Sequence, residues 1–225
     1  MPIKCLLAAF LLIAAAPVSP GYVWMNVKHF PGDLVTTVDA WSAIRAESPD
    51  QSYRIAADDF ELTQATRITK IVFWGAEVGD PEILGGDWYI FAGGGSGPPG
   101  ALLRAGPGGA MLHEDTGLVS PTFGKVFSNT LFPTDLVLPA GHYFLAFRTL
   151  QTLDLSGPKR NNAAFTTRVA IGSSRAWWSF DVLGDGTRTG PWVPMSDFNL
   201  APNNEWSFRI EGEQLGEIDE VRALR

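Results

Sequence analysis

The amino-acid sequence predicts an all-β protein, a single β-sandwich of the jelly-roll type. Glycine and proline account for 24 and 16 of the 225 residues, and they interrupt the chain too often for long helices. Between these interruptions lie short runs rich in β-branched and aromatic residues, at intervals of roughly 10–20 positions, as in sandwiches and barrels. Hydrophobic residues make up 45% of the chain and charged residues 18%, so the chain can bury a core and is not of the disordered class.

The short runs give about ten to twelve expected strands. In one of them, Ile68, Lys70, Val72 and Trp74 are expected to share a face, because strand side chains alternate between the two faces of a sheet. The runs that we expect to form strands are residues 22–27, 53–60, 67–74, 87–91, 101–104, 125–128, 135–138, 142–148, 165–171, 176–180 and 206–210.

Two segments depart from the strand pattern. Asp39 is a candidate N-cap for one helical turn that ends at Ile44. Residues 93–100 (GGGSGPPG) can be neither a strand interior nor a helix, so we expect a loop between two strands. This loop also lacks the Gly-Lys-Ser/Thr end of a phosphate-binding P-loop.

The N-terminal 20 residues are typical of a secretory signal peptide. Lys4 precedes an uncharged apolar run over residues 5–16, which is too short to span a bilayer of ~30 Å. Cleavage is expected at the alanines 14–16 or nearer residue 20. The prediction is therefore a signal peptide (1–20), a β-sandwich domain (21–212) and a charged tail or short amphipathic helix (213–225). We expect a secreted product that is released, periplasmic or held at the cell surface, with no membrane insertion.

The cysteine count and the net charge exclude several function classes. Cys5 is the single cysteine and lies in the signal peptide, so the mature domain is expected to be free of disulfides. Thiol catalysis, cysteine-bound zinc and iron–sulfur chemistry are excluded with it. The formal net charge is -7 and no basic cluster is present, so we expect no nucleic-acid partner.

Seven segments of the chain share a common pattern when they are taken in order: 23–26 (VWMN), 57–60 (ADDF), 68–75 (ITKIVFWG), 88–91 (WYIF), 97–103 (GPPGALL), 140–147 (AGHYFLAF) and 206–212 (WSFRIEG). Together they resemble a family of secreted bacterial β-sandwich domains, mostly of unassigned function, with an "aDDF" strand, a "W/F-x-G" strand, a "GGxPG" loop and a "G-x-Y-x-L" strand. The resemblance implies fold and compartment and supplies no reaction. Members of the family often carry a C-terminal sorting anchor, whose Pro-Glu-Pro motif, apolar helix and basic end do not occur in this sequence, so we expect free secretion rather than surface sorting.

Carboxylates suggest a site for a structural calcium ion. Asp58 and Asp59 are adjacent, so on a strand they point to opposite faces. One of them, with Glu205 or Asp197 and backbone carbonyls, would supply the hard oxygen ligands that Ca²⁺ prefers. The simpler interpretation is that these aspartates cap a turn at a strand end.

Tryptophan is the most distinctive residue type, with eight in the chain. Trp177 and Trp178 are neighbours, so one of them is expected to face outward, and Trp192 lies in a loop rich in glycine, proline and aspartate. An outward ring together with Trp192 would form a flat surface on which sugar rings stack. The alternative is that Trp192 folds back and covers the end of the sandwich. Side chains expected to hydrogen-bond sugar hydroxyls beside this surface are Arg175, Asp181 and Arg188.

Three function classes remain, and a non-catalytic binding protein for an extracellular glycan or surface polymer ranks first. The second is a self-assembling matrix protein, in which residues 21–30 or 213–225 pair with the sheet edge of a neighbouring copy. The third is a polysaccharide-active enzyme, which would need two carboxylates in one cleft or a group such as His142, Tyr143 and Arg148. Because strand alternation separates His142 from Tyr143, and the sequence has no H-E-x-x-H or G-x-S-x-G motif, we assign no catalytic residue.

Overall fold

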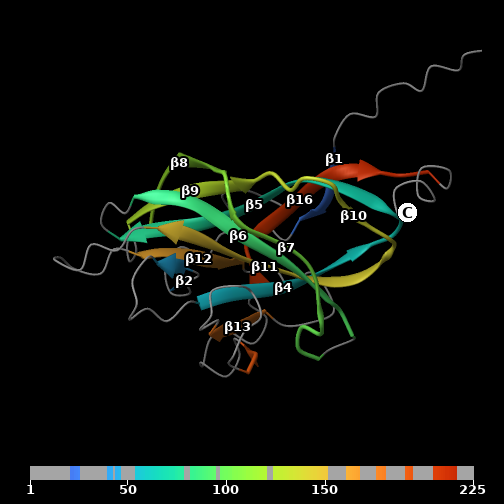
Figure 1. Ribbon diagram of the computed structural model, residues 1–225. Coiled ribbons are helices and arrows are strands. Elements are labelled where there is room, and N and C mark those ends of the chain that lie inside the picture. Colours follow the sequence, from blue (N-terminus) through green and yellow to red (C-terminus); the bar gives the residue numbers. More distant parts are fainter. Residues whose placement is uncertain are drawn as a thin grey trace, which may run out of the picture.

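The computed structural model describes residues 21–25, 40–42, 44–46, 54–78, 82–94, 97–120, 124–151, 161–167, 176–180, 191–194 and 205–216. This part of the chain is all β, as the sequence predicts, and it contains no helix. The described segments therefore include no helix that is long and apolar enough to cross a membrane. The strands form two sheets, which Figure 1 shows with β5, β9 and β16 above and β4 and β13 below.

The larger sheet has nine strands and is built around the long strand β5 (Thr66–Val78). All of its pairings are antiparallel. The central order is β1 (Gly21–Met25), β16 (Phe208–Gln214), β5, β12 (Asn161–Thr167) and β15 (Glu205–Trp206). Further pairings join β9 (Gly124–Leu131) and β10 (Leu136–Leu138) to β5, β2 (Ala40–Ser42) to β12, and β8 (Met111–Ser120) to β9.

The smaller sheet has seven strands, and it contains the residues of greatest interest. Its order is β14 (Val193–Pro194), β13 (Trp177–Phe180), β4 (Arg54–Leu62), β11 (Gly141–Gln151), β6 (Ile83–Ala92) and β7 (Leu102–Gly109). These pairings are antiparallel, whereas β3 (Ile44–Ala46) pairs with β11 in parallel.

A main apolar core joins side chains of both sheets. On β11, alternate residues such as Leu145 and Phe147 belong to it, and Phe73 of β5 stacks on Phe147 with ring centroids 4.5 Å apart. Ile71 and Phe208 of the larger sheet belong to the same cluster. In β5 this cluster takes Ile68 together with Ile71 and Phe73, and not with Val72 and Trp74 as the period of two predicts. The β5–β16 pairing shifts register between Lys70 and Ile68, which interrupts the regular alternation.

A second buried cluster lies on the opposite face of the smaller sheet, because the intervening residues of β11 are also apolar. We call this the outer face, and the sheet is therefore buried on both sides. The cluster consists of Ile55, Ala57, Tyr89, Phe91, Phe144, Ala146, Trp177 and Trp192.

The described residues contain sixteen strands, more than the ten to twelve expected. The predicted helical turn from Asp39 to Ile44 is wrong. Strand β2 lies within this stretch and β3 begins at its last residue, and the two strands pair with β12 and β11. Pairing with distant strands thus prevails over the local N-cap signal. Strand β8 has no counterpart among the predicted strands, and β16 continues two residues past the predicted domain end at Gly212. Residues 1–20 and 217–225 lie outside the described residues.

Candidate functional site

The outer face of the smaller sheet carries an alternating series of side chains from β11. His142, Phe144 and Arg148 point to this face. In the register, His142 pairs with β4, Arg148 pairs with β6, and Phe144 pairs with both strands. The register places Asp59 and Phe91 beside Phe144. The face therefore has an aromatic centre with a charged group toward each end of β11.

A buried ion pair occupies one end. Arg148 and Asp87 are both fully buried, and Arg148 Nε donates a hydrogen bond of 2.6 Å to Asp87 Oδ2. The same guanidinium donates through Nη2 to the Tyr89 hydroxyl (2.7 Å) and lies 5.4 Å from the centroid of the Tyr89 ring. Charges are buried in proteins when they are paired and hydrogen-bonded in this way.

A histidine–aspartate pair occupies the other end. His142 Nε2 lies 2.7 Å from Oδ2 of the buried Asp59. His142 Nδ1 is also buried, against the backbone of Gly93, where a methyl group would clash with the ring. The side chain of His142 is 23% exposed. One ring nitrogen thus contacts the carboxylate of Asp59 and the other is buried against Gly93.

Asp58 points the other way, toward the larger sheet. Its Oδ2 accepts a hydrogen bond of 2.6 Å from the backbone N–H of Trp206, and its Oδ1 accepts one of 2.9 Å from the N–H of Asp59. The indole Nε1 of Trp206 donates to the carbonyl of Trp177 (2.9 Å). Asp58 and Trp206 therefore fasten β4 and β13 of one sheet to β15 of the other.

The residues predicted to hold calcium are only partly brought together. Asp58 contacts the neighbour of Glu205 in β15, as expected of an early strand beside a late one, but Asp59 faces the opposite side of β4. The side chains of Glu205 and Asp197 lie outside the described part. Within that part, no group of three His, Cys, Asp or Glu side chains could hold a metal ion. Calcium stays a prediction.

The two described tryptophans of the predicted sugar surface are buried. Trp177 is 9% exposed and Trp192 is 6% exposed, and the Trp192 ring meets Phe91 edge to face at 5.5 Å. This is the arrangement of the alternative interpretation, in which Trp192 covers the sheet. Trp178 lies in β13, but its side chain is outside the description, as are Arg175, Asp181 and Arg188.

Sequence reasoning missed two members of the outer face, Asp87 and Tyr89. A signal was present: Asp87 stands at the head of an apolar strand, and Arg148 stands at the end of another. A charged side chain is costly to bury alone. One acidic and one basic residue in two such apolar strands are therefore expected to form an ion pair.

Comparisons with family models, with curated proteins and with solved structures find no match to this chain.

Proposed function

We propose that this protein is a secreted, non-catalytic β-sandwich protein that binds an extracellular glycan or another surface polymer. The observation that carries the proposal is the aromatic cluster on the outer face of the smaller sheet. This cluster gathers the rings of Tyr89, Phe91, Phe144 and two tryptophans on one face of the sheet, where they are buried.

The composition of this face suits a sugar polymer. Ligand sites combine aromatic surface with a few placed polar groups, and sugars offer apolar ring faces together with hydroxyl groups. Because Trp177 and Trp192 are buried, contact would be made at the rim of the cluster, where Pro191 is exposed and His142 partly so. Arg175, Asp181 and Arg188 are proposed to supply hydrogen bonds there.

The non-catalytic part of the proposal is supported by the contacts that the buried carboxylates make within the protein. Asp59 is held by His142 and Asp87 by Arg148, so both carboxylates already bind partners within the fold. Hydrolysis of a glycosidic bond needs two carboxyl groups on facing sides of a sugar. Such a pair is not formed by the described acids of the outer face.

A glycan array tests the proposal. The full-length protein is probed with calcium and then with a chelator, and selective binding to one polymer class is expected. Loss of the signal in the chelator would support the proposed structural Ca²⁺ ion, which involves Asp58 or Asp59 with Glu205. A blank array under both conditions would contradict the binding function.

A triple variant locates the binding site. Arg175→Ala, Asp181→Ala and Arg188→Ala together are expected to abolish binding with little change in melting temperature. The matched control is Arg104→Ala, an exposed residue on β7 at the opposite edge of the same sheet, which should bind as wild type. Equal binding by the triple variant and the control would place the ligand elsewhere.

Self-assembly is the second candidate, and strand β1 favours it. Residues 21–25 pair only with β16 among the described strands, so the other side of β1 is an edge that a neighbouring copy could join. Sedimentation velocity over a hundredfold range of concentration tests this. If the particle grows with concentration in the wild type and does not grow in Tyr22→Pro, assembly through β1 is supported. A particle of constant size in the wild type would exclude assembly through β1.

A further inference from the structure

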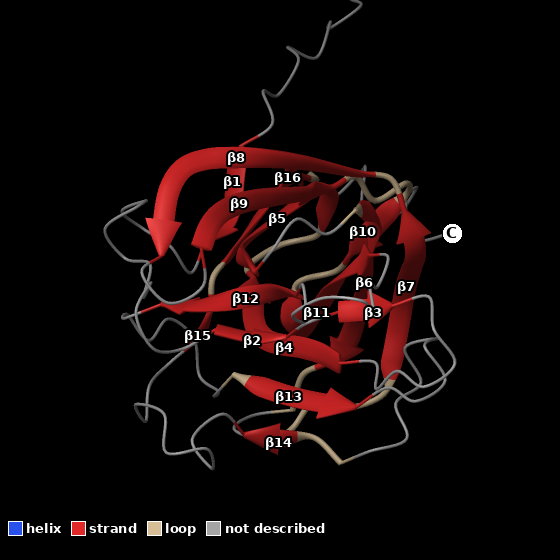
Figure 2. Ribbon diagram, turned by 90° about the vertical axis from the view of Figure 1, so that its left-hand side faces the viewer, coloured by secondary structure: helices blue, strands red, loops and turns tan. Residues whose placement is uncertain are grey.

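Strand β8 is an edge of the larger sheet, and an irregularity in this strand affects whether a second copy of the chain can pair with it. β8 has ten residues and, among the described strands, pairs only with β9. Figure 2 shows β8 along the outside of its sheet. Leu112 is 46% exposed and Val119 is 70% exposed. A long edge strand with exposed apolar side chains is a template on which another strand can pair.

The ladder between β8 and β9 is interrupted in the middle of this edge. Asp115 pairs with Phe127 and Val119 pairs with Lys125, so three residues of β8 lie opposite the single residue Val126. Gly117 in this bulge has a φ of 73°, a left-handed conformation that residues with a side chain rarely adopt. The two extra residues break the regular spacing of N–H and C=O groups along β8.

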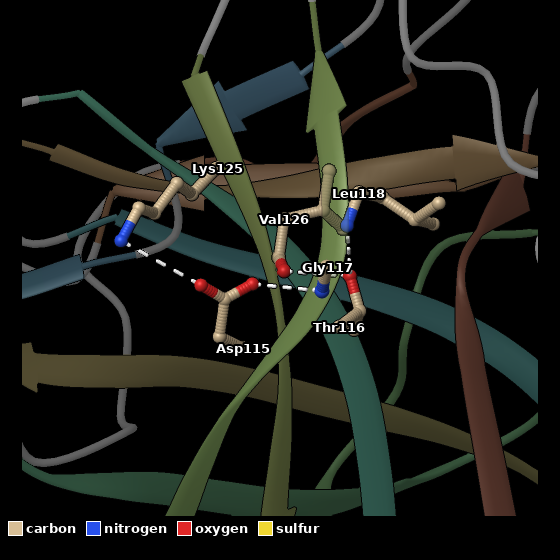
Figure 3. A network of polar contacts seen from close by, with 6 residues as sticks. All are labelled: Asp115, Thr116, Gly117, Leu118, Lys125 and Val126. Carbon is tan, nitrogen blue, oxygen red and sulfur yellow. Dashed lines mark hydrogen bonds and ion pairs between the residues drawn. The ribbon is translucent and has the colours of Figure 1, made fainter.

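Side chains of the bulge hold it in place, as Figure 3 shows. Asp115 Oδ1 accepts a hydrogen bond from the N–H of Gly117 (2.8 Å), and the Thr116 hydroxyl donates to the Val126 carbonyl (2.7 Å). Thr116 Oγ1 also accepts from the N–H of Leu118 (3.3 Å). Two backbone N–H groups of the bulge thus bind side chains of their own strand, which removes them as donors to an incoming strand.

Charge adds to the effect. Lys125 Nζ, on the neighbouring strand β9, lies 3.6 Å from Oδ2 of Asp115 on the edge strand β8, and both side chains are exposed. Charged side chains on an edge strand oppose pairing, because a second strand would have to desolvate them.

The neighbouring edge, β7 of the smaller sheet, has a similar construction. The pairing with β6 shifts register between Ile90 and Phe91, and the guanidinium of Arg104 donates to the carbonyl of Leu103 (2.8 Å). Pro107 has no N–H to offer. The two edges on this flank, joined through Ala110, are therefore irregular in independent ways.

We propose that the Asp115–Leu118 bulge closes the β8 edge to strand addition by a second copy of this chain. Without it, β8 would present a continuous ladder with Leu112 and Val119 beside it. This proposal concerns a different edge from β1, so it stands or falls separately from the functions proposed above.

A deletion tests the proposal. Removing Gly117 and Leu118 leaves Thr116 alone opposite Val126 and restores one-to-one pairing. Cys5 is the sole native cysteine, so the full-length chain with Cys5→Ser and Leu112→Cys reports contact at this edge alone, when the copies are cross-linked through the two thiols with a long, flexible bis-maleimide that reaches between them in any register. We expect the fraction of cross-linked dimer to rise about tenfold on deletion, the effect of one or two net hydrogen bonds. Adding Val119→Lys to the deletion should return the fraction of cross-linked dimer to that of the chain without the deletion.

A second variant covers the case in which the deletion does not fold. Asp115→Ala with Thr116→Val keeps the chain length and removes the three hydrogen bonds of the bulge, and a smaller rise in cross-linking is expected. Circular dichroism establishes whether each variant is folded. A folded variant of either kind that cross-links no more than the parent would overturn the proposal.

Discussion

Asp58 illustrates how one side chain can join two sheets. Its carboxylate is fully buried and accepts the backbone N–H of Trp206, which lies 148 positions away in the chain. The N–H of Trp206 faces the smaller sheet and depends on this acceptor, since an unpaired buried N–H is costly. The "DDF" segment thus has a structural explanation that does not require an ion.

Asp58→Ala is expected to destabilise the protein by about 2 kcal/mol, the cost of leaving a buried donor unpaired. Urea denaturation measures the free energy of unfolding. Glu114→Ala, an exposed acid on β8, is the control and should change it by less than about 0.5 kcal/mol. Equal values for the two variants would show that the contact with Trp206 is dispensable.

Tyr143 predicts how stability depends on pH in the alkaline range. Burial raises the pKa of its hydroxyl above the ordinary value of 10.0, and the hydroxyl donates to the Pro139 carbonyl (3.0 Å). Above pH 10 the unfolded chain releases this proton more readily than the folded one, so the stability contributed below that pH is lost as the pH rises. The melting temperature of Tyr143→Phe should fall less steeply above pH 10 than that of wild type. Parallel curves would contradict this.

At the scale of elements, the segment that holds Trp192 covers the aromatic cluster of the outer face. Trp192→Ala is expected to cost about 3–4 kcal/mol, typical of truncating a buried tryptophan. Trp192→Phe, which keeps a ring near Phe91, should cost less than half as much. Urea denaturation of both variants measures this. If Trp192→Ala is as stable as wild type, the Trp192 ring is not part of the packed core and lies at the surface instead.

The connection after β6 tests close packing against β11. A side chain at Gly93 would collide with the imidazole and carbonyl of His142, whereas one at Gly94 meets nothing within 4 Å. We expect Gly93→Ala to lower stability by about 1–3 kcal/mol and Gly94→Ala to leave it nearly unchanged. Thermal unfolding of the two single variants gives the comparison. Similar losses in both would attribute the effect to loop flexibility instead of contact.

Strand positions were predicted well where a continuous apolar or β-branched run lies between turn signals, as in β5, β6 and β11. Prediction failed where the signal is polar or local. The run Met111–Ser120 mixes charged residues with a bulge at Gly117, so it does not show the alternation of a strand. The stretch from Asp39 to Ile44 has a capping residue, yet its strands are formed by distant partners.

At the scale of the whole molecule, the pairing of strands far apart in the chain predicts slow folding. The first described strand, β1, pairs with the last, β16, which in turn pairs with β5. Such long-range pairing requires large loops to close before contacts form. Refolding followed by tryptophan fluorescence in a stopped-flow instrument is expected to take longer than about 1 ms and up to seconds. Complete recovery within the instrument's dead time would contradict this.

The sequence by itself determined the all-β class, the positions of the apolar strands β5, β6 and β11, and the opposite orientations of Asp58 and Asp59. These follow from local propensity and from the period of two along a strand. Only the tertiary structure decided that Asp58 binds Trp206, that Arg148 meets Asp87, and that Trp177 and Trp192 are buried. These facts depend on which distant strands become neighbours, and the alternation of residues within one strand carries no information about its partner.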